Sequence, residues 1–219
     1  MNWWRYYVPR KELKGDWKIT TDYPEGFCIC EVSTGDDRGP KTVDNVLLLL
    51  RDPLKDLIRF PFDKMCAWFE EDEQIYVHPK DPYKRIDIRR SSRHIKVEVD
   101  GIVVAETNQP TLLFETMLRT RYYLPATCVV HKLSNSNTVT SCPYKGDASY
   151  SNVVVNGKEI KDVAWRYKFP TLESVPIAGL LCFYNEKVDI WVDGVKESQS
   201  TDEETKPWQE SHGRSLIST

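Results

Sequence analysis

The chain has 219 residues, of which 40% are hydrophobic and 11% aromatic, a composition that excludes a wholly disordered protein. Its 30 basic and 33 acidic residues give a formal charge of −3, which excludes general electrostatic attraction to nucleic acid or to an anionic membrane. No apolar run approaches the roughly 20 residues of a bilayer-spanning helix, and the first residues lack the apolar segment of a signal peptide. We expect a cytoplasmic protein with neither a nucleic-acid nor a membrane partner.

The six cysteines and four histidines form no recognisable metal motif. Cys28 and Cys30 make a C-x-C pair, whereas the other four cysteines are scattered and no histidine lies at zinc-finger spacing. A zinc site would need ligands from distant positions. We expect free thiols in a reducing compartment, no metal and no cofactor.

Three regions are expected along the chain. Residues 1–62 are predicted to be a degenerate repeat unit packed on a core β domain of residues 63–198, and the polar residues 199–219 are predicted to be disordered. The repeat rests on two segments, 47–61 and 112–125, which match at a shift of 64 positions and both end in proline. Each is predicted to form a short helix or helical turn. The matches are few, so a chance similarity stays open.

Strand signals dominate the core. Residues 94–106 alternate around Asp100-Gly101 and residues 187–198 around Asp193-Gly194, and Asp-Gly is typical of a tight hairpin turn. Further strands are expected at 68–69, 74–77, 85–88, 153–155, 163–167 and 179–184. The sequence therefore predicts a mainly β protein with a compact antiparallel fold, barrel-like or tent-like, with hairpins and one or two short helices.

Residues 78–87 contain the first candidate site residues. Alternation along a strand places Arg85 and Asp87 on one face, with isoleucines on the other. A charged row of this kind is typical of a solvated face. The alternative is that Arg85 and Asp87 line a polar cavity that His78 enters, since Pro79 keeps His78 out of a helix.

Residues 115–123 contain the second group. On a helix, Glu115 and Arg119 would form a structural i,i+4 pair. Arg121 beside Tyr122 and Tyr123 is more informative, because a guanidinium held against aromatic rings binds carboxylate or phosphate through two hydrogen bonds. A buried ion pair is the alternative for Arg121.

The third group is a loop followed by a strand. Cys142, Tyr144 and Lys145 lie next to a glycine, and a desolvated lysine near phenols would have a lowered pKa that suits a base or a Schiff-base nucleophile. Against this, a lysine in a turn is commonly exposed and without a role. Trp165 and Tyr167 share one strand face, which suits either a core or an aromatic pocket wall.

Several motifs occur together in the order of a known family. They are "HPKDPYKRID", "VEVDGIVVAET", "LLFETMLRTRYYLP", "TSCPYKGDASY", "AWRYKFP" and "GLLCFYNEKVDIWVDG". On them, residues 67–194 resemble the family known as domain of unknown function 427, also labelled a nucleotidyltransferase-like domain. The resemblance implies a compact antiparallel β protein around a cavity and brings no established catalytic residues. One departure is Met117-Leu118-Arg119, where such proteins usually have Gly-Leu-Pro.

Three functional hypotheses follow. The leading one is a cytoplasmic β protein that binds a small polar or anionic organic molecule. Such a protein would either bind the molecule without changing it or catalyse an isomerase, cyclase or lyase reaction. Lys145 or His78 would be the base, Tyr144 the proton donor and Arg121 the anion ligand. The second is a non-enzymatic interaction module whose charged residues form buried networks. The third is a nucleotide- or RNA-processing protein, although no phosphate-binding glycine loop supports it. A homodimer formed through an exposed strand edge is also considered.

Overall fold

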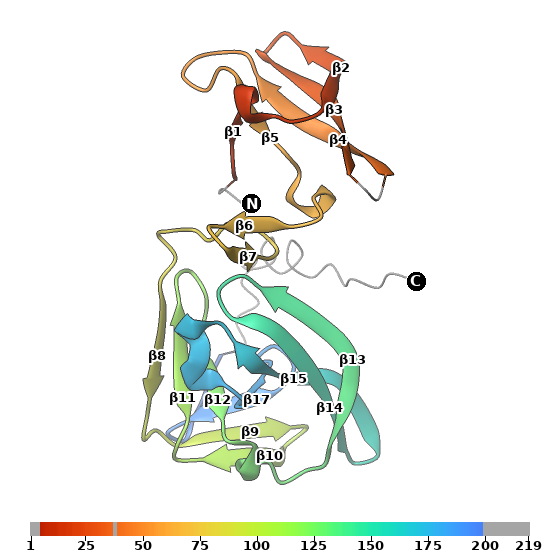
Figure 1. Ribbon diagram of the computed structural model, residues 1–219. Helices are drawn as coiled ribbons and strands as arrows, with labels where there is room; N and C mark the ends of the chain where they lie inside the picture. The colour runs from red at the N-terminus through yellow and green to blue at the C-terminus, as the bar shows by residue number, and fades with distance from the viewer. Residues whose placement is uncertain (1–4, 37–38, 199–219) are drawn as a thin grey trace. The chain divides into compact units, whose positions relative to one another are not determined.

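A computed structural model describes residues 5–36 and 39–198 (Figure 1). The chain is mainly β, as the sequence predicts, and its antiparallel sheets stay open and do not close into a barrel. It divides into two compact units, Asn2–Asp81 and Pro82–Thr219. The tail predicted for residues 199–219 lies outside the described residues. No helix in the described ranges is long and apolar enough to cross a membrane.

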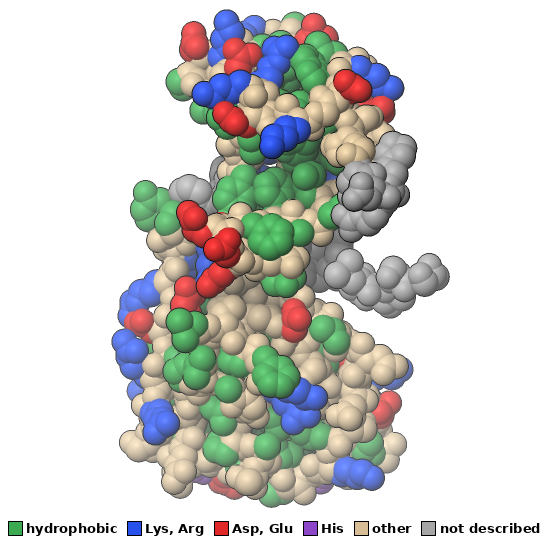
Figure 2. All heavy atoms as spheres, viewed as in Figure 1, with side chains coloured by type: hydrophobic (Ala, Val, Ile, Leu, Met, Phe, Trp, Pro, Cys, Tyr) green, Lys and Arg blue, Asp and Glu red, His purple; other side chains and the backbone are tan. Residues whose placement is uncertain are grey.

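The N-terminal unit contains a five-stranded antiparallel sheet in the order β1-β5-β4-β3-β2 and a two-stranded sheet, β6-β7. Side chains at alternating positions of β3 and β4 point to the same side and form a small core with Ile58 of β5. Over the face seen in Figure 2, basic and acidic side chains are mixed on this unit. The elements are β1 (Val8–Pro9), the 3-10 helix η1 (Arg10–Glu12), β2 (Asp16–Tyr23), β3 (Phe27–Asp36), β4 (Gly39–Leu49), β5 (Leu57–Arg59), η2 (Phe62–Lys64), β6 (Trp68–Glu70) and β7 (Glu73–Ile75).

The second unit combines a seven-stranded sheet, β13-β14-β15-β16-β12-β11-β8, with a four-stranded sheet, β10-β9-β17-β18. Its elements are β8 (Ile86–Arg90), β9 (Ile95–Val99), β10 (Ile102–Thr107), β11 (Thr111–Glu115), β12 (Arg121–Leu124), η3 (Ala126–Cys128), β13 (Leu133–Cys142), β14 (Gly146–Val155), β15 (Lys158–Pro170), η4 (Leu172–Ile177), β16 (Leu181–Phe183), β17 (Asp189–Val192) and β18 (Val195–Lys196).

The seven-stranded sheet has two unlike faces, because successive side chains on a strand point to opposite sides. One face packs Val153, Ala164 and Phe183 against Ile95 and Val97 of the four-stranded sheet, and this is the main core. The opposite face, which we call the tyrosine face, has its own cluster. It consists of Leu113, Tyr123, Ala148, Tyr150, Trp165, Tyr167 and Cys182, with Ile177 of η4 packed against it.

The two predicted hairpins are present. Strands β9 and β10 pair across Asp100-Gly101, and β17 and β18 pair across Asp193-Gly194. All four turn residues have positive φ angles, between 49° and 83°. Asp tolerates this conformation and Gly adopts it freely, which is why the Asp-Gly pair identified both turns.

The two predicted helical segments are wrong. Residues 47–61 contain the end of β4, a turn and β5, and residues 112–125 contain most of β11, a turn and β12. The apolar runs in both segments were compatible with a strand or a helix. Pairing with neighbouring strands made both segments β structure. In the second, Leu112 pairs with Tyr122 on one side and with Arg89 on the other.

Candidate functional site

The tyrosine face carries four of the ten predicted site residues. Arg121 and Tyr123 come from β12, and Trp165 and Tyr167 come from β15, in each case two positions apart. Two-residue spacing on a strand puts both side chains of each pair on the same side of the sheet. Only β16 lies between β12 and β15 in the sheet, so these side chains lie one strand apart on the same surface.

Lys145 is held at the edge of this face by a buried ion pair. It lies in the turn between β13 and β14, and its Nζ donates to Oε2 of Glu115 at 2.5 Å, while Lys84 Nζ lies 3.0 Å from the other oxygen. Lys145 is only 8% exposed and Glu115 only 7%. Gly146, with a φ of 95°, allows the chain to turn back here. A carboxylate with two lysines is therefore enclosed by the fold.

The pKa values of this pair favour its charged form. For Glu115, burial would raise the pKa, but Lys145 and Lys84 outweigh it, so the pKa lies below its usual value. For Lys145, burial would lower the pKa, but Cys142 and Glu115 outweigh it and raise the pKa. The expectation of a lowered lysine pKa is therefore wrong. At neutral pH, Lys145 is therefore a positively charged side chain that donates a hydrogen bond to Glu115.

Arg121 is occupied by partners from the protein itself. Its two terminal nitrogens donate to the two carboxylate oxygens of Glu186, each at 3.1 Å, and one also donates to Asn185 Oδ1 at 2.9 Å. Its guanidinium carbon lies 5.4 Å from the ring centre of Trp165 and 5.9 Å from that of Tyr184. The guanidinium lies against aromatic rings, although these are Trp165 and Tyr184 and not the expected Tyr122 and Tyr123, and it binds an internal carboxylate.

The phenols of the tyrosine face form a hydrogen-bonded set. Trp165 Nε1 donates to the Tyr123 hydroxyl at 3.3 Å, and the Tyr150 hydroxyl lies 2.8 Å from Thr140 Oγ1 and 3.2 Å from the Tyr184 hydroxyl. Burial raises the pKa of Tyr123 well above its usual value. The pKa of Tyr167 is raised in the same way, again mainly by burial. The hydroxyls of Tyr123 and Tyr167 are therefore protonated at neutral pH.

The remaining predicted residues lie elsewhere. Arg85 and Asp87 form an ion pair that Arg89 joins, and the side chain of Arg85 is 75% exposed, so this is the solvated charged row. The Tyr144 ring is buried 5.6 Å from Lys84 Nζ. His78 belongs to the N-terminal unit, where its Nδ1 lies 2.6 Å from the carbonyl oxygen of Pro79, and its part in the site stays a prediction.

Sequence reasoning missed or misassigned several members. It paired Glu115 with Arg119 on a helix, whereas Glu115 ends β11 and pairs with the two lysines. It did not include Lys84, Tyr150 or Glu186 in the site. A buried glutamate that ends the apolar strand "TLLFE" was the available signal, because a buried carboxylate needs a cation.

The chain is thus a mainly β protein in which one sheet face carries a buried set of tyrosines beside enclosed ion pairs. Residues 87–194, from β8 to the last hairpin turn, match the family described as domain of unknown function (DUF427). This match confirms the family resemblance that the motifs indicate. No curated protein matches the chain in a sequence comparison.

Proposed function

We propose that the tyrosine face, with the Lys145–Glu115 pair at its edge, binds a small polar or anionic organic molecule. The observation that supports this is the enclosure of Lys145, Glu115 and Lys84 in a protein of this size. Burying charges costs several kcal/mol per ion, and apolar residues of similar volume are often as stabilising. Enclosed ionised groups with shifted pKa values are enriched at functional sites.

Acid–base chemistry of the isomerase, cyclase or lyase type is the enzymatic form of this proposal. Lys145 would supply a positive charge, because its raised pKa keeps it protonated. Tyr144 stays the predicted proton donor and His78 the predicted base. Glu115 is a second candidate base, since its lowered pKa keeps it ionised at neutral pH.

The test uses the full chain and a double variant, Glu115→Gln with Lys145→Met, which removes both charges of the pair at once. A set of small organic acids, including succinate, citrate and pyruvate, is titrated while the indole N–H resonance of Trp165 is followed. We expect a saturable shift with at least one acid, and its loss in the double variant. Unchanged binding in that variant, or no response to any acid, contradicts the proposal.

The second candidate is a non-enzymatic module in which these pairs hold the strands together. The observation that favours it is that the Arg121 guanidinium already donates hydrogen bonds to Asn185 and Glu186. Its charge is therefore compensated within the protein. Under this hypothesis the double variant changes only stability. A melting temperature that drops, with no acid bound by the wild type, would support it.

We propose a cytoplasmic protein with a first unit of residues 1–62 that repeats part of the core and packs on it. Light scattering of the purified chain tests the homodimer, which would form through the unpaired edge of β2, β8 or β13.

A further inference from the structure

Two sheets of this chain have the same strand order. In the N-terminal sheet the order is β1-β5-β4-β3-β2, and five strands of the seven-stranded sheet follow the order β12-β16-β15-β14-β13. Both series begin in nearly identical sequence, "RYYVP" at residues 5–9 and "RYYLP" at residues 121–125. In both, a 3-10 helix of three residues follows the proline, as η1 and as η3.

The irregularities in the registers of the two sheets also lie at corresponding places, although the pairing slips by one residue in the N-terminal sheet and by two in the second. The pairing of β3 with β4 shifts between Cys30 and Val32, and that of β14 with β15 shifts between Ser151 and Val153. The pairing of β2 with β3 shifts after Ile19, and that of β13 with β14 shifts after Asn135. Ile19 pairs with Cys30, and Asn135 pairs with Ser151. Outside these shifts, the strand positions of one sheet therefore have equivalent residues in the other.

Each of the two sheets has a pocket at the same place. Of the eight residues that line each pocket, six occupy equivalent positions. Three pairs are similar in size in the two copies: Leu13 and Val129, Cys30 and Ser151, Ile58 and Leu181. The second pocket lies on the face opposite to the tyrosine face, since Ser151 and Leu181 alternate with Tyr150 and Cys182.

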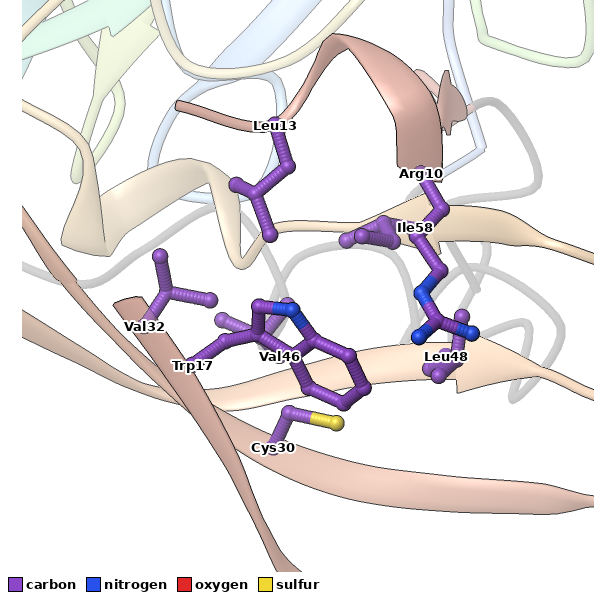
Figure 3. A pocket seen from close by; sticks show the side chains of 8 residues that line it. All are labelled: Arg10, Leu13, Trp17, Cys30, Val32, Val46, Leu48 and Ile58. Atoms are coloured by element: carbon purple, nitrogen blue, oxygen red, sulfur yellow. The ribbon is translucent and has the colours of Figure 1, made fainter. Parts of the chain in front are cut away.

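The N-terminal pocket is filled by its own side chains (Figure 3). The Arg10 guanidinium carbon lies 4.4 Å from the ring centre of Trp17, and the two side chains occupy the space beside Cys30 and Leu48. What is left is too small for a water molecule. The equivalents of Arg10 and Trp17 are Ala126 and Leu133, so the second pocket lacks both filling groups.

The second pocket has a volume of about 290 Å³ and a distinct chemistry. Where the filled copy has Leu48, this one has Arg166, which is half-buried and whose guanidinium has no hydrogen-bond or ion-pair partner among residues 5–36 and 39–198. His131, Asn135 and Ser151 add further hydrogen-bond donors, and no acidic residue lines the pocket. Val129, Leu133 and Leu181 supply an apolar wall.

We propose that this pocket, the Arg166 pocket, binds a small organic anion, whose carboxylate or phosphate group pairs with Arg166 while its apolar body contacts Leu133 and Leu181. A guanidinium matches both oxyanions through two parallel hydrogen bonds. The volume is close to the lower end of the roughly 300–1,000 Å³ range of small-molecule sites. The site does not depend on the ligand proposed for the tyrosine face, because the sheet separates the two.

The test is a titration of the isotopically labelled full chain, with the backbone amide resonances of Val129, Ser151 and Leu181 as reporters. The probes are benzoate, phenyl phosphate and, as the neutral match, benzamide. We expect saturable shifts with at least one anion and none with benzamide, and the tighter anion identifies the preferred group. Arg166→Met should weaken binding about tenfold or more, as expected for a charged hydrogen bond.

A second variant copies the filled pocket. Ala126→Arg with Leu133→Trp should abolish binding, and Thr127→Arg, which adds the same charge on an exposed neighbour, should not. Arg166→Met serves alone if the double variant fails to fold. No saturable shift with either anion, or equal affinity in Arg166→Met, overturns the proposal. Shifts confined to the Trp165 side and lost in Glu115→Gln with Lys145→Met would also overturn it, while supporting the tyrosine face as the binding site.

Discussion

Glu115 is a buried carboxylate whose charge is balanced by lysines from two separate segments. Lys145 comes from the turn after β13 and Lys84 from the residues before β8. Removing one member of a buried pair is costly because the other charge is left without compensation, typically by about 3–5 kcal/mol. The two lysines share one carboxylate, so loss of Glu115 should lower the stability of the fold more than loss of either lysine.

We therefore expect Glu115→Gln to lower the free energy of unfolding at pH 7 by about 3–5 kcal/mol, as measured by urea denaturation. The pKa of Glu115 is lowered in the folded state, so its charge stabilises the fold above the unfolded pKa of about 4.3, and this contribution is lost as pH falls through the folded pKa. The difference between wild type and variant should be constant from pH 7 to pH 5 and shrink below about pH 4. A difference that is unchanged at pH 3 contradicts this account.

Cys182, on the tyrosine face, has a thiol whose protonation state can be tested. Burial raises the pKa of its thiol to about 12, although the nearby Arg121 opposes this. The thiol is therefore protonated and enclosed at neutral pH. Cys66, by contrast, is exposed.

We expect a maleimide reagent at pH 7.5 to modify Cys66 and to leave Cys182 unmodified while the protein is folded, since the thiolate is the reactive form. Peptide mass spectrometry measures the extent at each cysteine. Addition of urea to unfold the chain should make the two sites react alike. Modification of Cys182 in the folded protein would show that this face opens to solvent.

Among the elements, the turn from β11 to β12 has a strained backbone at Met117, a position where the sequence departs from the family's motif. Met117 has a φ of 63° and a side chain that is 93% exposed, so it contributes no packing at this position. The family resemblance implies glycine at this position. A left-handed residue other than glycine costs about 1–2 kcal/mol.

Met117→Gly should therefore raise the free energy of unfolding by about 1 kcal/mol, visible as a higher melting temperature. Met117→Ala is the matched control, because it removes the same side chain and keeps the strained backbone. An equal effect of both replacements would mean that the side chain, and not the backbone, decides stability here.

For the whole molecule, the two units have separate cores. Ile58 belongs to the small core of the N-terminal unit and Ile190 to the main core of the second, and both are buried. A buried isoleucine contributes typically about 2–5 kcal/mol, measured by replacement with alanine. Each replacement should act within its own unit.

We expect Ile58→Ala to speed hydrogen exchange in β3 and β4 and to leave β9 protected, and Ile190→Ala to do the reverse. Exchange followed by mass spectrometry resolves these segments. If either variant exposes both sets of strands equally, the chain unfolds as one cooperative unit.

The sequence by itself determined the β class, both Asp-Gly hairpins and the family, because turn chemistry and strand alternation are local properties of the chain. It also placed Arg121, Tyr123, Trp165, Tyr167 and Lys145 among the candidate site residues. It could not give their partners. Glu115 and Lys145 are 30 positions apart, and Arg121 and Glu186 are 65 apart, so their pairing follows from sheet order.

The tertiary structure also decided what local patterns left ambiguous. The segments 47–61 and 112–125 had apolar runs that fit either helix or strand, and only pairing with neighbouring strands made them β. The same holds for Arg166, which the sequence did not distinguish from other basic residues. Only the sheet registers show that Arg166 occupies the position of Leu48 in the N-terminal sheet. Arg10 and Trp17 fill the pocket of that sheet, whereas the smaller residues at their equivalent positions leave the second pocket open. Charge pairing and pocket shape depend on contacts between distant strands, which no local pattern encodes.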